Sequence, residues 1–300
     1  MSALKVAIHP VWDFDIDIPG VEVIRWDLKD PAPEGLDILV TGHWMSPNGV
    51  ELAQRTGAHL LQIGSIGFDS LNPDLPEGLQ VANAATVHET ATSEMVVGIL
   101  IALYRQIPTM VRNTEHRRWD NFYTSGLADR KIMLIGVGGV GRAIAQRLEP
   151  FEVELTYVAS RERDEEYGHV FALSQIDALL PQQDAVVVVI PATDSTRGMI
   201  DRDFLSQMKD GAVFLNAGRG TLADTQALAE AGHRLQIAVD VADPEPLPPD
   251  SPLWDTAQLI TSHNGGNTLG MHRRMKVLVE RQIKHALAGE PFENIVLGKK

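Results

Sequence analysis

The sequence predicts an α/β protein with two doubly wound parallel-sheet domains. Its 300 residues are too many for one ordinary hydrophobic core, so two domains are expected. Short apolar runs alternate with helical patterns along the chain, which is typical of parallel sheets covered by helices. A glycine-rich turn at residues 136–141 starts a second series of these units and therefore marks the second domain.

The first third of the chain predicts one parallel sheet. Its apolar runs are nearly continuous in Leu and β-branched residues, as in strands that are buried on both faces. The predicted strands are residues 4–9, 21–26, 36–40 and 59–63. A short helix is expected over residues 47–56, and one long helix over residues 89–112.

The second series of units repeats this alternation. It begins with a strand at 131–137 and a helix at 139–148 that Pro150 closes. Further strands are expected at 153–158, 185–190, 212–216 and 236–241, and helices at 201–208, 224–231 and 269–288. The first two of these helices carry an Asp N-cap, and residues 244–252 form a proline-rich, rigid loop.

Composition restricts the possible functions. Hydrophobic residues make up 44% of the chain and charged residues 22%, as in a globular protein. The absence of cysteine excludes disulfides, thiolate nucleophiles and Cys-ligated zinc, so we expect a cytoplasmic protein without a metal site. With 26 basic and 40 acidic residues the net charge is −14, which argues against a nucleic-acid partner.

No targeting or membrane segment is expected. The N-terminus has no basic region followed by a long apolar core, so it does not resemble a signal peptide. The longest apolar run in a predicted helix, residues 95–103, is far shorter than the ~20 residues of a membrane span. It is better explained as a buried core helix.

The glycine-rich turn predicts a dinucleotide site. The pattern G-x-G-x-x-G is weak alone, but here it follows an apolar strand and opens a helix with apolar residues at Val140, Ile144 and Leu148. Glycines let the backbone touch a pyrophosphate, and the helix N-terminus offers free N–H groups and a positive dipole. The predicted contacts are Gly136, Gly138, Gly139, Val140 and Gly141.

The end of the next strand predicts which dinucleotide binds. NAD-binding sites place an acidic residue there for the ribose hydroxyls, whereas this chain has Ala159, followed by Ser160 and Arg161. No carboxylate would repel a 2′-phosphate, and Ser160 and Arg161 can bind one. We therefore expect NADP(H) to be preferred, with NAD(H) still possible. The alternative is that Arg161 and Arg163 belong to a solvated charged loop.

Three polar residues, Arg219, Glu245 and His263, each follow a strand-like apolar run, where α/β enzymes keep their ligands. A fixed cation, a carboxylate and an imidazole beside a nicotinamide suffice to reduce a 2-keto acid, since imidazole titrates near neutral pH. Each has a simpler explanation: a surface arginine, an exposed loop acid, and a structural histidine among ten.

Taken together, these segments resemble the D-isomer-specific 2-hydroxyacid dehydrogenase family, and most closely its NADPH-dependent glyoxylate/hydroxypyruvate reductase-like subgroup. The resemblance covers nearly the whole chain. It rests on residues 61–69, 81–83, 93–94, 208–212, 216–220, 240–253, 289–291 and Asn294. The chain departs from the family pattern at Ala84-Ala85-Thr86 and at Asn264, which puts a glyoxylate-sized substrate in doubt.

The resemblance implies a role for each candidate residue. Arg219 would bind the substrate carboxylate and keto oxygen, His263 would donate the proton, and Glu245 would hydrogen-bond His263. Backbone N–H groups of Ile66 and Gly67, in a loop with Ser65, would hold the carboxylate. Trp44 and Met45 would either enclose a bulky substrate tail or pack in the core. Further cofactor contacts would come from Pro191, Thr196, Ala217 and Asp240.

The resemblance also implies the domain arrangement and the activity. A Rossmann cofactor domain, residues 92–262, would be inserted into a flavodoxin-like substrate domain formed by residues 1–91 and 263–300. The expected activity is hydride transfer between NADP(H) and a 2-keto acid/D-2-hydroxy acid pair, in a homodimer with the long helix over residues 89–112 and residues 117–123 in its interface. The alternatives are a formate or phosphite dehydrogenase-type enzyme of the same fold, and a non-enzymatic NAD(P)H-sensing scaffold similar to the family's corepressors.

Overall fold

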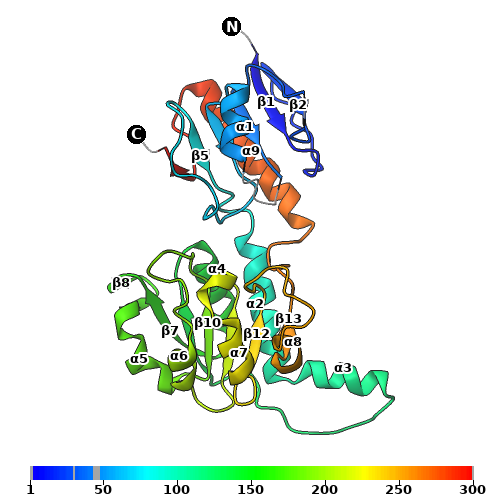
Figure 1. The fold of residues 1–300 in the computed structure, drawn as a ribbon, viewed down its shortest axis with the longest axis vertical. Coiled ribbons are helices and arrows are strands. Elements are labelled where there is room, and N and C mark those ends of the chain that lie inside the picture. The colour runs from blue at the N-terminus through cyan, green and yellow to red at the C-terminus, as the bar shows by residue number, and fades with distance from the viewer. Residues whose placement is uncertain (1–2, 30, 43–47, 299–300) are drawn as a thin grey trace. The chain divides into compact units, whose positions relative to one another are not determined.

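The computed structural model describes residues 3–29, 31–42 and 48–298. The chain forms two compact units (Figure 1). One consists of Met1–His88 with Thr268–Lys300, and the other of Glu89–Asn267. They are named here the six-stranded unit and the eight-stranded unit, after their sheets.

The six-stranded unit has the strand order β14-β5-β4-β3-β1-β2. The strands are β1 (Leu4–Ile8), β2 (Val21–Arg25), β3 (Ile38–Val40), β4 (Leu60–Gln62), β5 (Gln80–Ala82) and β14 (Ile295–Leu297). The first five are parallel and follow the flavodoxin-like order 2-1-3-4-5. Only β14, which pairs with β5, is antiparallel within this sheet. The predicted α/β fold is thus confirmed, with one edge strand of opposite direction.

Helices cover both faces of this sheet. Alternate residues of a strand point to opposite faces, so Val6 and Ile8 of β1 join one core cluster and Ala7 joins the other. Helix α9 (Gly270–Ala288) packs on the first face, and helix α1 (Gly49–Thr56) on the second. Both helices end at a glycine in the left-handed conformation.

The eight-stranded unit has the order β13-β12-β11-β10-β6-β7-β9-β8. Its strands are β6 (Lys131–Ile135), β7 (Glu154–Ala159), β8 (Arg163–Glu165), β9 (Gly168–Ala172), β10 (Ala185–Val188), β11 (Val213–Asn216), β12 (Gln236–Val239) and β13 (Leu259–Ile260). All are parallel except β8. The chain leaves β6 in one direction to β7 and β9, and returns on the other side at β10. Ligands of such sheets bind where the order reverses, at the carboxyl ends of β6 and β10.

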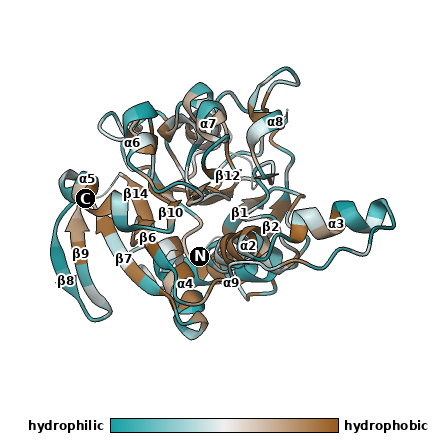
Figure 2. Cartoon of the chain, turned by 90° about the horizontal axis from the view of Figure 1, so that it is seen from below, coloured by the Kyte–Doolittle hydropathy of each residue, from teal (hydrophilic) through white to brown (hydrophobic). Residues whose placement is uncertain are grey.

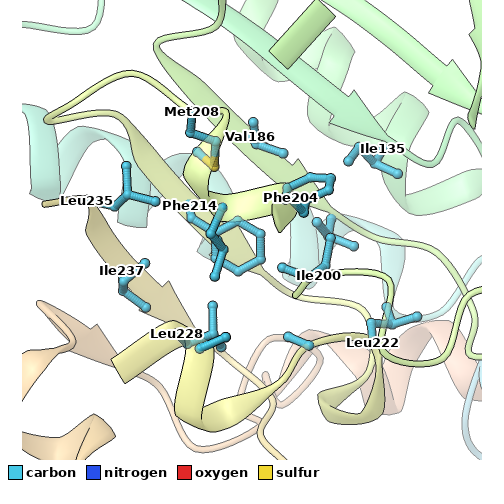
Figure 3. Packing of buried hydrophobic residues seen from close by; sticks show 14 of the residues in the cluster. Ile135, Val186, Ile200, Phe204, Met208, Phe214, Leu222, Leu228, Leu235 and Ile237 are labelled. Carbon is cyan, nitrogen blue, oxygen red and sulfur yellow. The ribbon is translucent and has the colours of Figure 1, made fainter. Parts of the chain in front are cut away.

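Two helical layers enclose the eight-stranded sheet. Helices α2 (Glu89–Tyr104) and α4 (Gly139–Leu148) share one core cluster with it. Helices α6 (Arg202–Ser206) and α7 (Thr225–Ala231) share the other, in which Phe204 meets Phe214 edge to face at 6.5 Å (Figure 3). Shorter elements complete the unit: α5 (Ile176–Leu179), α8 (Leu253–Thr256) and the 3₁₀ turns η1 (Glu149–Phe151), η2 (Leu173–Gln175), η3 (Leu180–Gln182) and η4 (Gly220–Leu222).

The expectation of one long helix over residues 89–112 is wrong. Helix α2 ends at Tyr104, and α3 (Ile107–Glu115) leaves it at an angle of 70°. Gln106 between them is left-handed, with φ of 51°, and Pro108 cannot donate the backbone hydrogen bond that a continuous helix needs. Among the described residues no single helix is long and apolar enough to cross a membrane; only the bent pair α2 and α3 meets that test.

A short hairpin of β8 and β9 follows β7, where the sequence analysis expected no strands. Its outer strand β8 is polar and mainly teal, whereas the central strand β6 is mainly brown (Figure 2). Arg163 and Glu165 of β8 form an ion pair at 2.7 Å. Because β8 lies at the edge of the sheet, its side chains are not buried, and the apolar pattern that reveals a central strand is missing.

Candidate active site

The glycine-rich turn has the geometry of a phosphate cradle. It joins β6 to the ten-residue helix α4, which Gly138 caps. Gly136 has φ of 113°, and a Cβ there would lie 2.7 Å from the carbonyl oxygen of Val189. A Cβ at Gly141 would collide with the carbonyl of Gly136. Gly138 and Gly139 are exposed at the helix N-terminus, so the turn fits the pyrophosphate of a dinucleotide.

Two loops continue this edge of the sheet after β10 and β11. In the first, the buried hydroxyl of Thr196 donates to the carbonyl of Pro191 at 3.0 Å and accepts from the N–H of Thr193 at 2.8 Å. In the second, the N–H of Ala217 donates to the carbonyl of Val188 at 3.0 Å. The predicted cofactor residues Pro191 and Thr196 therefore follow the carboxyl end of β10, and Ala217 follows the carboxyl end of the adjacent strand β11.

The end of β7 presents Ala159, then the exposed Ser160 and Arg161. Neighbouring charges are already paired. Arg163 binds Glu165 at 2.7 Å, which holds the pKa of Glu165 below its ordinary value, and Glu162 lies 3.1 Å from His169. Within the part of the chain that the structure describes, the guanidinium of Arg161 has no ion-pair partner.

Arg219 is held by a loop with two close backbone approaches. A Cβ at Gly218 would lie 2.8 Å from the carbonyl oxygen of Ile190, and a Cβ at Gly220 would collide with the carbonyl of Ala242. The flanking glycines therefore let the Arg219 loop pack against the loops after β10 and β12. The side chain of Arg219 is half-buried, and its Nη1 donates to the carbonyl of Gly218 at 2.7 Å.

The buried side-chain amide of Asn216 fixes the loop that carries Arg219. Asn216, the last residue of β11, is fully buried. Its Nδ2 donates to the carbonyl of Arg219 at 2.8 Å, and its Oδ1 accepts from the N–H of Gly218 at 3.1 Å. One side chain thus satisfies both ends of the turn that carries Arg219.

His263 and Glu245 lie in direct contact. The Nδ1 atom of His263 is 2.5 Å from Oε1 of Glu245. Both side chains are partly exposed, at 49% and 42%, so solvent or a ligand can reach them. With Nδ1 engaged by the carboxylate, Nε2 is the ring atom left for proton exchange with another molecule.

The turn that carries His263 is unusual, because Ser262 and His263 have φ of 50° and 55°. Residues other than glycine rarely adopt this backbone conformation unless the surrounding structure imposes it. Here the buried Asp240, directly after β12, imposes it. Its Oδ1 accepts from Thr261 Oγ1 at 2.6 Å and from the N–H of Asn264 at 2.9 Å, and its backbone carbonyl accepts from the N–H of His263 at 2.5 Å.

The six-stranded unit contains the predicted substrate-carboxylate loop. Ser65, Ile66 and Gly67 follow β4 and are half-buried. The backbone N–H groups of these three residues have no acceptor among the described residues, which is the arrangement that binds an anion. The two predicted pocket residues Trp44 and Met45 lie outside the described residues.

The structural roles of Asn216 and Asp240 were not predicted from the sequence. Asn216 is the last residue of β11 and Asp240 directly follows β12, and a polar residue at the carboxyl end of a buried strand is the signal that could have revealed them. Among the residues that the structure describes, no group of three or more His, Cys, Asp and Glu side chains is arranged to hold a metal ion.

Comparison with known proteins agrees with this geometry. Residues 97–265 match the family model described as D-isomer specific 2-hydroxyacid dehydrogenase, NAD binding domain. The chain is 30% identical over 297 residues to the human glyoxylate reductase/hydroxypyruvate reductase, covering 90% of this chain and 89% of that protein. It is 32% identical over 290 residues to the mitochondrial formate dehydrogenase of Hordeum vulgare, covering 88% of this chain and 74% of that protein.

A solved structure extends the similarity to both units. The D-isomer specific 2-hydroxyacid dehydrogenase of Xanthobacter autotrophicus Py2, solved in complex with NADPH and MES, has a TM-score of 0.80 at 26% identity. The alignment covers 99% of this chain and 98% of that one. The family match, the dinucleotide cradle and the His263–Glu245 pair lead to one conclusion: the protein is an NAD(P)-dependent enzyme of the D-isomer specific 2-hydroxyacid dehydrogenase family.

Proposed function

We propose that this enzyme is an NADP(H)-preferring reductase that converts 2-keto acids to D-2-hydroxy acids. The 2.5 Å contact between His263 and Glu245 carries the proposal. A carboxylate on Nδ1 fixes the orientation of the imidazole, so that Nε2 can give a proton to a carbonyl oxygen and take one back in the reverse direction. When bound, the nicotinamide supplies the hydride.

Arg219 is proposed to hold the reacting end of the substrate. Its planar guanidinium can form two parallel hydrogen bonds, one to the carboxylate and one to the keto oxygen. Polarisation of the keto group by a fixed cation makes the carbonyl carbon more electrophilic. The buried Asn216 supports this role, because it fixes the backbone from which Arg219 projects.

The amide groups of Ile66 and Gly67, with the neighbouring Ser65, are proposed to bind the substrate carboxylate. Their N–H groups, which have no acceptor in the described part of the chain, support this assignment, because such groups attract an anion without adding a side chain to the site. A carboxylate next to a keto group is common to all 2-keto acids, so this interaction selects the substrate class. Trp44 and Met45 remain predictions for the group that selects the size of the substrate tail.

The cofactor preference is proposed from the end of β7. Ala159 leaves no carboxylate to repel a 2′-phosphate, and Arg161 is available to bind one. Glu162 is held by His169 and by Nε2 of Gln175, at 3.1 and 3.4 Å, so its charge is partly compensated. The NADPH bound in the X. autotrophicus relative agrees with this preference.

We also propose that the enzyme is a homodimer. Helix α3 and the segment after it expose large apolar side chains that a monomer would leave in water. Trp119 and Tyr123 are fully exposed, and Ile107, Met110 and Val111 of α3 are exposed by 40, 39 and 52%. A second copy of the chain is the proposed partner, since exposed aromatic residues are typical of protein interfaces.

A formate dehydrogenase-type activity is the second candidate, because the Hordeum relative bears that name. One panel separates the two. The enzyme is mixed with NADPH or NADH and keto acids from glyoxylate to phenylpyruvate, and separately with NADP⁺ or NAD⁺ and formate. Loss of absorbance at 340 nm with at least one keto acid is expected. Turnover of formate alone, or of nothing, would refute the proposal.

A further inference from the structure

The loop proposed to bind the substrate carboxylate has an unusual division of its hydrogen bonds. The carbonyl groups of Gly64, Ser65, Ile66 and Gly67 all accept a hydrogen bond from within the six-stranded unit. The N–H groups of Ser65, Ile66 and Gly67 find no acceptor among the described residues. Four consecutive carbonyls are satisfied, while the neighbouring amides are kept available for a ligand.

Peptide geometry explains why the carbonyls matter. In a trans peptide, the C=O of one residue and the N–H of the next point in opposite directions. A donor that fixes the carbonyl of Gly64 therefore directs the N–H of Ser65 away from that donor. In the same way, the carbonyl of Ser65 sets the N–H of Ile66, and the carbonyl of Ile66 sets the N–H of Gly67.

Two side chains supply the decisive donors. His88, which is 91% buried, has its Nε2 2.8 Å from the carbonyl oxygen of Gly64. Asn83, which is 92% buried, donates from Nδ2 to the carbonyl of Ile66 at 2.8 Å. Between them, the backbone N–H of Ala84 donates to the carbonyl of Ser65 at 2.9 Å.

A second layer holds Asn83 in place. The fully buried Gln62 donates from Nε2 to the carbonyls of Ile63 and Asn83, both at 3.0 Å. Its Oε1 accepts from Nε2 of Gln282 on helix α9 at 2.9 Å. Buried amides must satisfy these groups to be tolerated, so the network fixes the end of β4, the end of β5 and α9 relative to one another.

We infer that Asn83 and His88 are positioning residues for the substrate carboxylate. By binding the carbonyl of Ile66, Asn83 orients the N–H of Gly67, and by binding the carbonyl of Gly64, His88 orients the N–H of Ser65. The amide groups of the loop are therefore oriented before a carboxylate binds. This inference rests on the proposed function, because it takes the anion to be the carboxylate of a 2-keto acid. Neither side chain contacts the substrate, and each acts through one peptide group.

Asn83→Asp tests the inference with a matched control. Aspartate keeps the shape of the side chain and the acceptor for the N–H of Ala85 at 3.2 Å, but it cannot donate to Ile66. The control is Asn294→Asp, which removes a donor to the carbonyl of Ala85 at 3.0 Å in the same unit without touching residues 64–67. Asn294 has φ of 56°, a conformation that aspartate also adopts.

The expected result for Asn83→Asp is a rise of about tenfold in KM for the keto acid and in Ki for oxamate, an unreactive carboxylate. The value of kcat should change little, because ground state and transition state lose the same interaction. NADPH affinity, measured by fluorescence titration, should not change. Asn294→Asp should keep the original KM even if its melting temperature falls.

A second pair of variants covers the case in which Asn83→Asp does not fold. His88→Gln keeps a side-chain N–H donor and should stay within a few fold of the original KM, whereas His88→Leu should show the tenfold rise. Equal KM values for Asn83→Asp, Asn294→Asp and the unaltered enzyme would overturn the inference while the proposed function stands. If the unaltered enzyme reduces no keto acid, the proposed function and this inference both fail.

Discussion

The amide of Gly265 lies against the carboxylate of Asp240, with its N–H 3.1 Å from Oδ2 and 3.2 Å from Oδ1. A Cβ at position 265 would stand 2.6 Å from Oδ2, closer than side chains tolerate. The turn that carries His263 is therefore built directly onto a buried carboxylate. The position of the proposed acid/base residue depends on that contact.

Gly265→Ala is expected to displace this turn and reduce kcat roughly tenfold, because a small misplacement of an acid/base group is costly. NADPH affinity should remain within a few fold. The control is Gly98→Ala in α2, where a Cβ would meet nothing within 4 Å and alanine favours the helix. Steady-state kinetics check both, and an unchanged kcat in Gly265→Ala would show that the turn tolerates the shift.

His263→Ala should lower kcat on the order of a hundredfold to ten-thousandfold, because the variant lacks the proposed proton donor. Glu245→Gln should have a smaller effect, since it keeps a hydrogen-bonding group near Nδ1 but loses the charge. The exposed His233→Ala serves as a control and should retain full activity. Single-turnover reduction with NADPH measures the chemical step, and near-normal rates in His263→Ala would exclude His263 as the acid.

Arg161→Ala should raise KM for NADPH by about tenfold and leave KM for NADH unchanged, because only NADPH carries the 2′-phosphate. The matched control is Arg163→Ala, since Arg163 is already paired with Glu165. The ratio of kcat/KM for the two cofactors is the measurement. A preference of the unaltered enzyme for NADH would contradict the cofactor assignment.

Asp184 is expected to make stability depend on pH. Burial raises the pKa of its carboxyl, but hydrogen bonds from the backbone N–H of Lys131 at 2.9 Å and from Lys209 Nζ at 3.0 Å outweigh burial and leave the pKa below its ordinary value. A depressed native pKa contributes stability above the ordinary carboxyl pKa, and that contribution is lost as pH falls through the native pKa.

Asp184→Asn should therefore cost roughly 1–2 kcal/mol of unfolding free energy at pH 7, and the difference from the unaltered protein should shrink below about pH 4. Asp210→Asn is the control, because its ion pair with Arg234 involves a carboxylate that is 84% exposed. Urea denaturation at several pH values measures both. A deficit independent of pH would mean that the charge of Asp184 contributes nothing.

The proposed homodimer predicts a particle of twice the 32.9-kDa chain mass in chromatography with light scattering. Trp119→Ser should shift the population towards monomer, because exposed tryptophans are frequent binding hot spots. Trp254→Ser, which alters another exposed tryptophan on α8, should leave the mass unchanged. A monomeric unaltered protein would refute the proposed assembly.

Much of the fold could be predicted because strands buried on both faces leave continuous apolar runs, as at Val186–Val188 in β10. The edge strand β8 was missed because it is polar, and β14 was missed because three apolar residues are too short a run to indicate a strand. The break at Gln106 was missed for another reason: the apolar spacing continues across it, and the left-handed φ of that residue is not encoded in hydrophobic periodicity.

The sequence by itself determined the α/β architecture, the glycine turn and the family, because each depends on residues that are close in the chain. Tertiary structure alone decided how the candidate residues are held. Asp240 reaches Thr261 across 21 positions, and Gln282 reaches Gln62 across 220. A hydrogen bond of this kind forms only when the backbone at two distant positions places the donor and the acceptor within reach and in the right orientation. No local pattern of residues specifies that geometry.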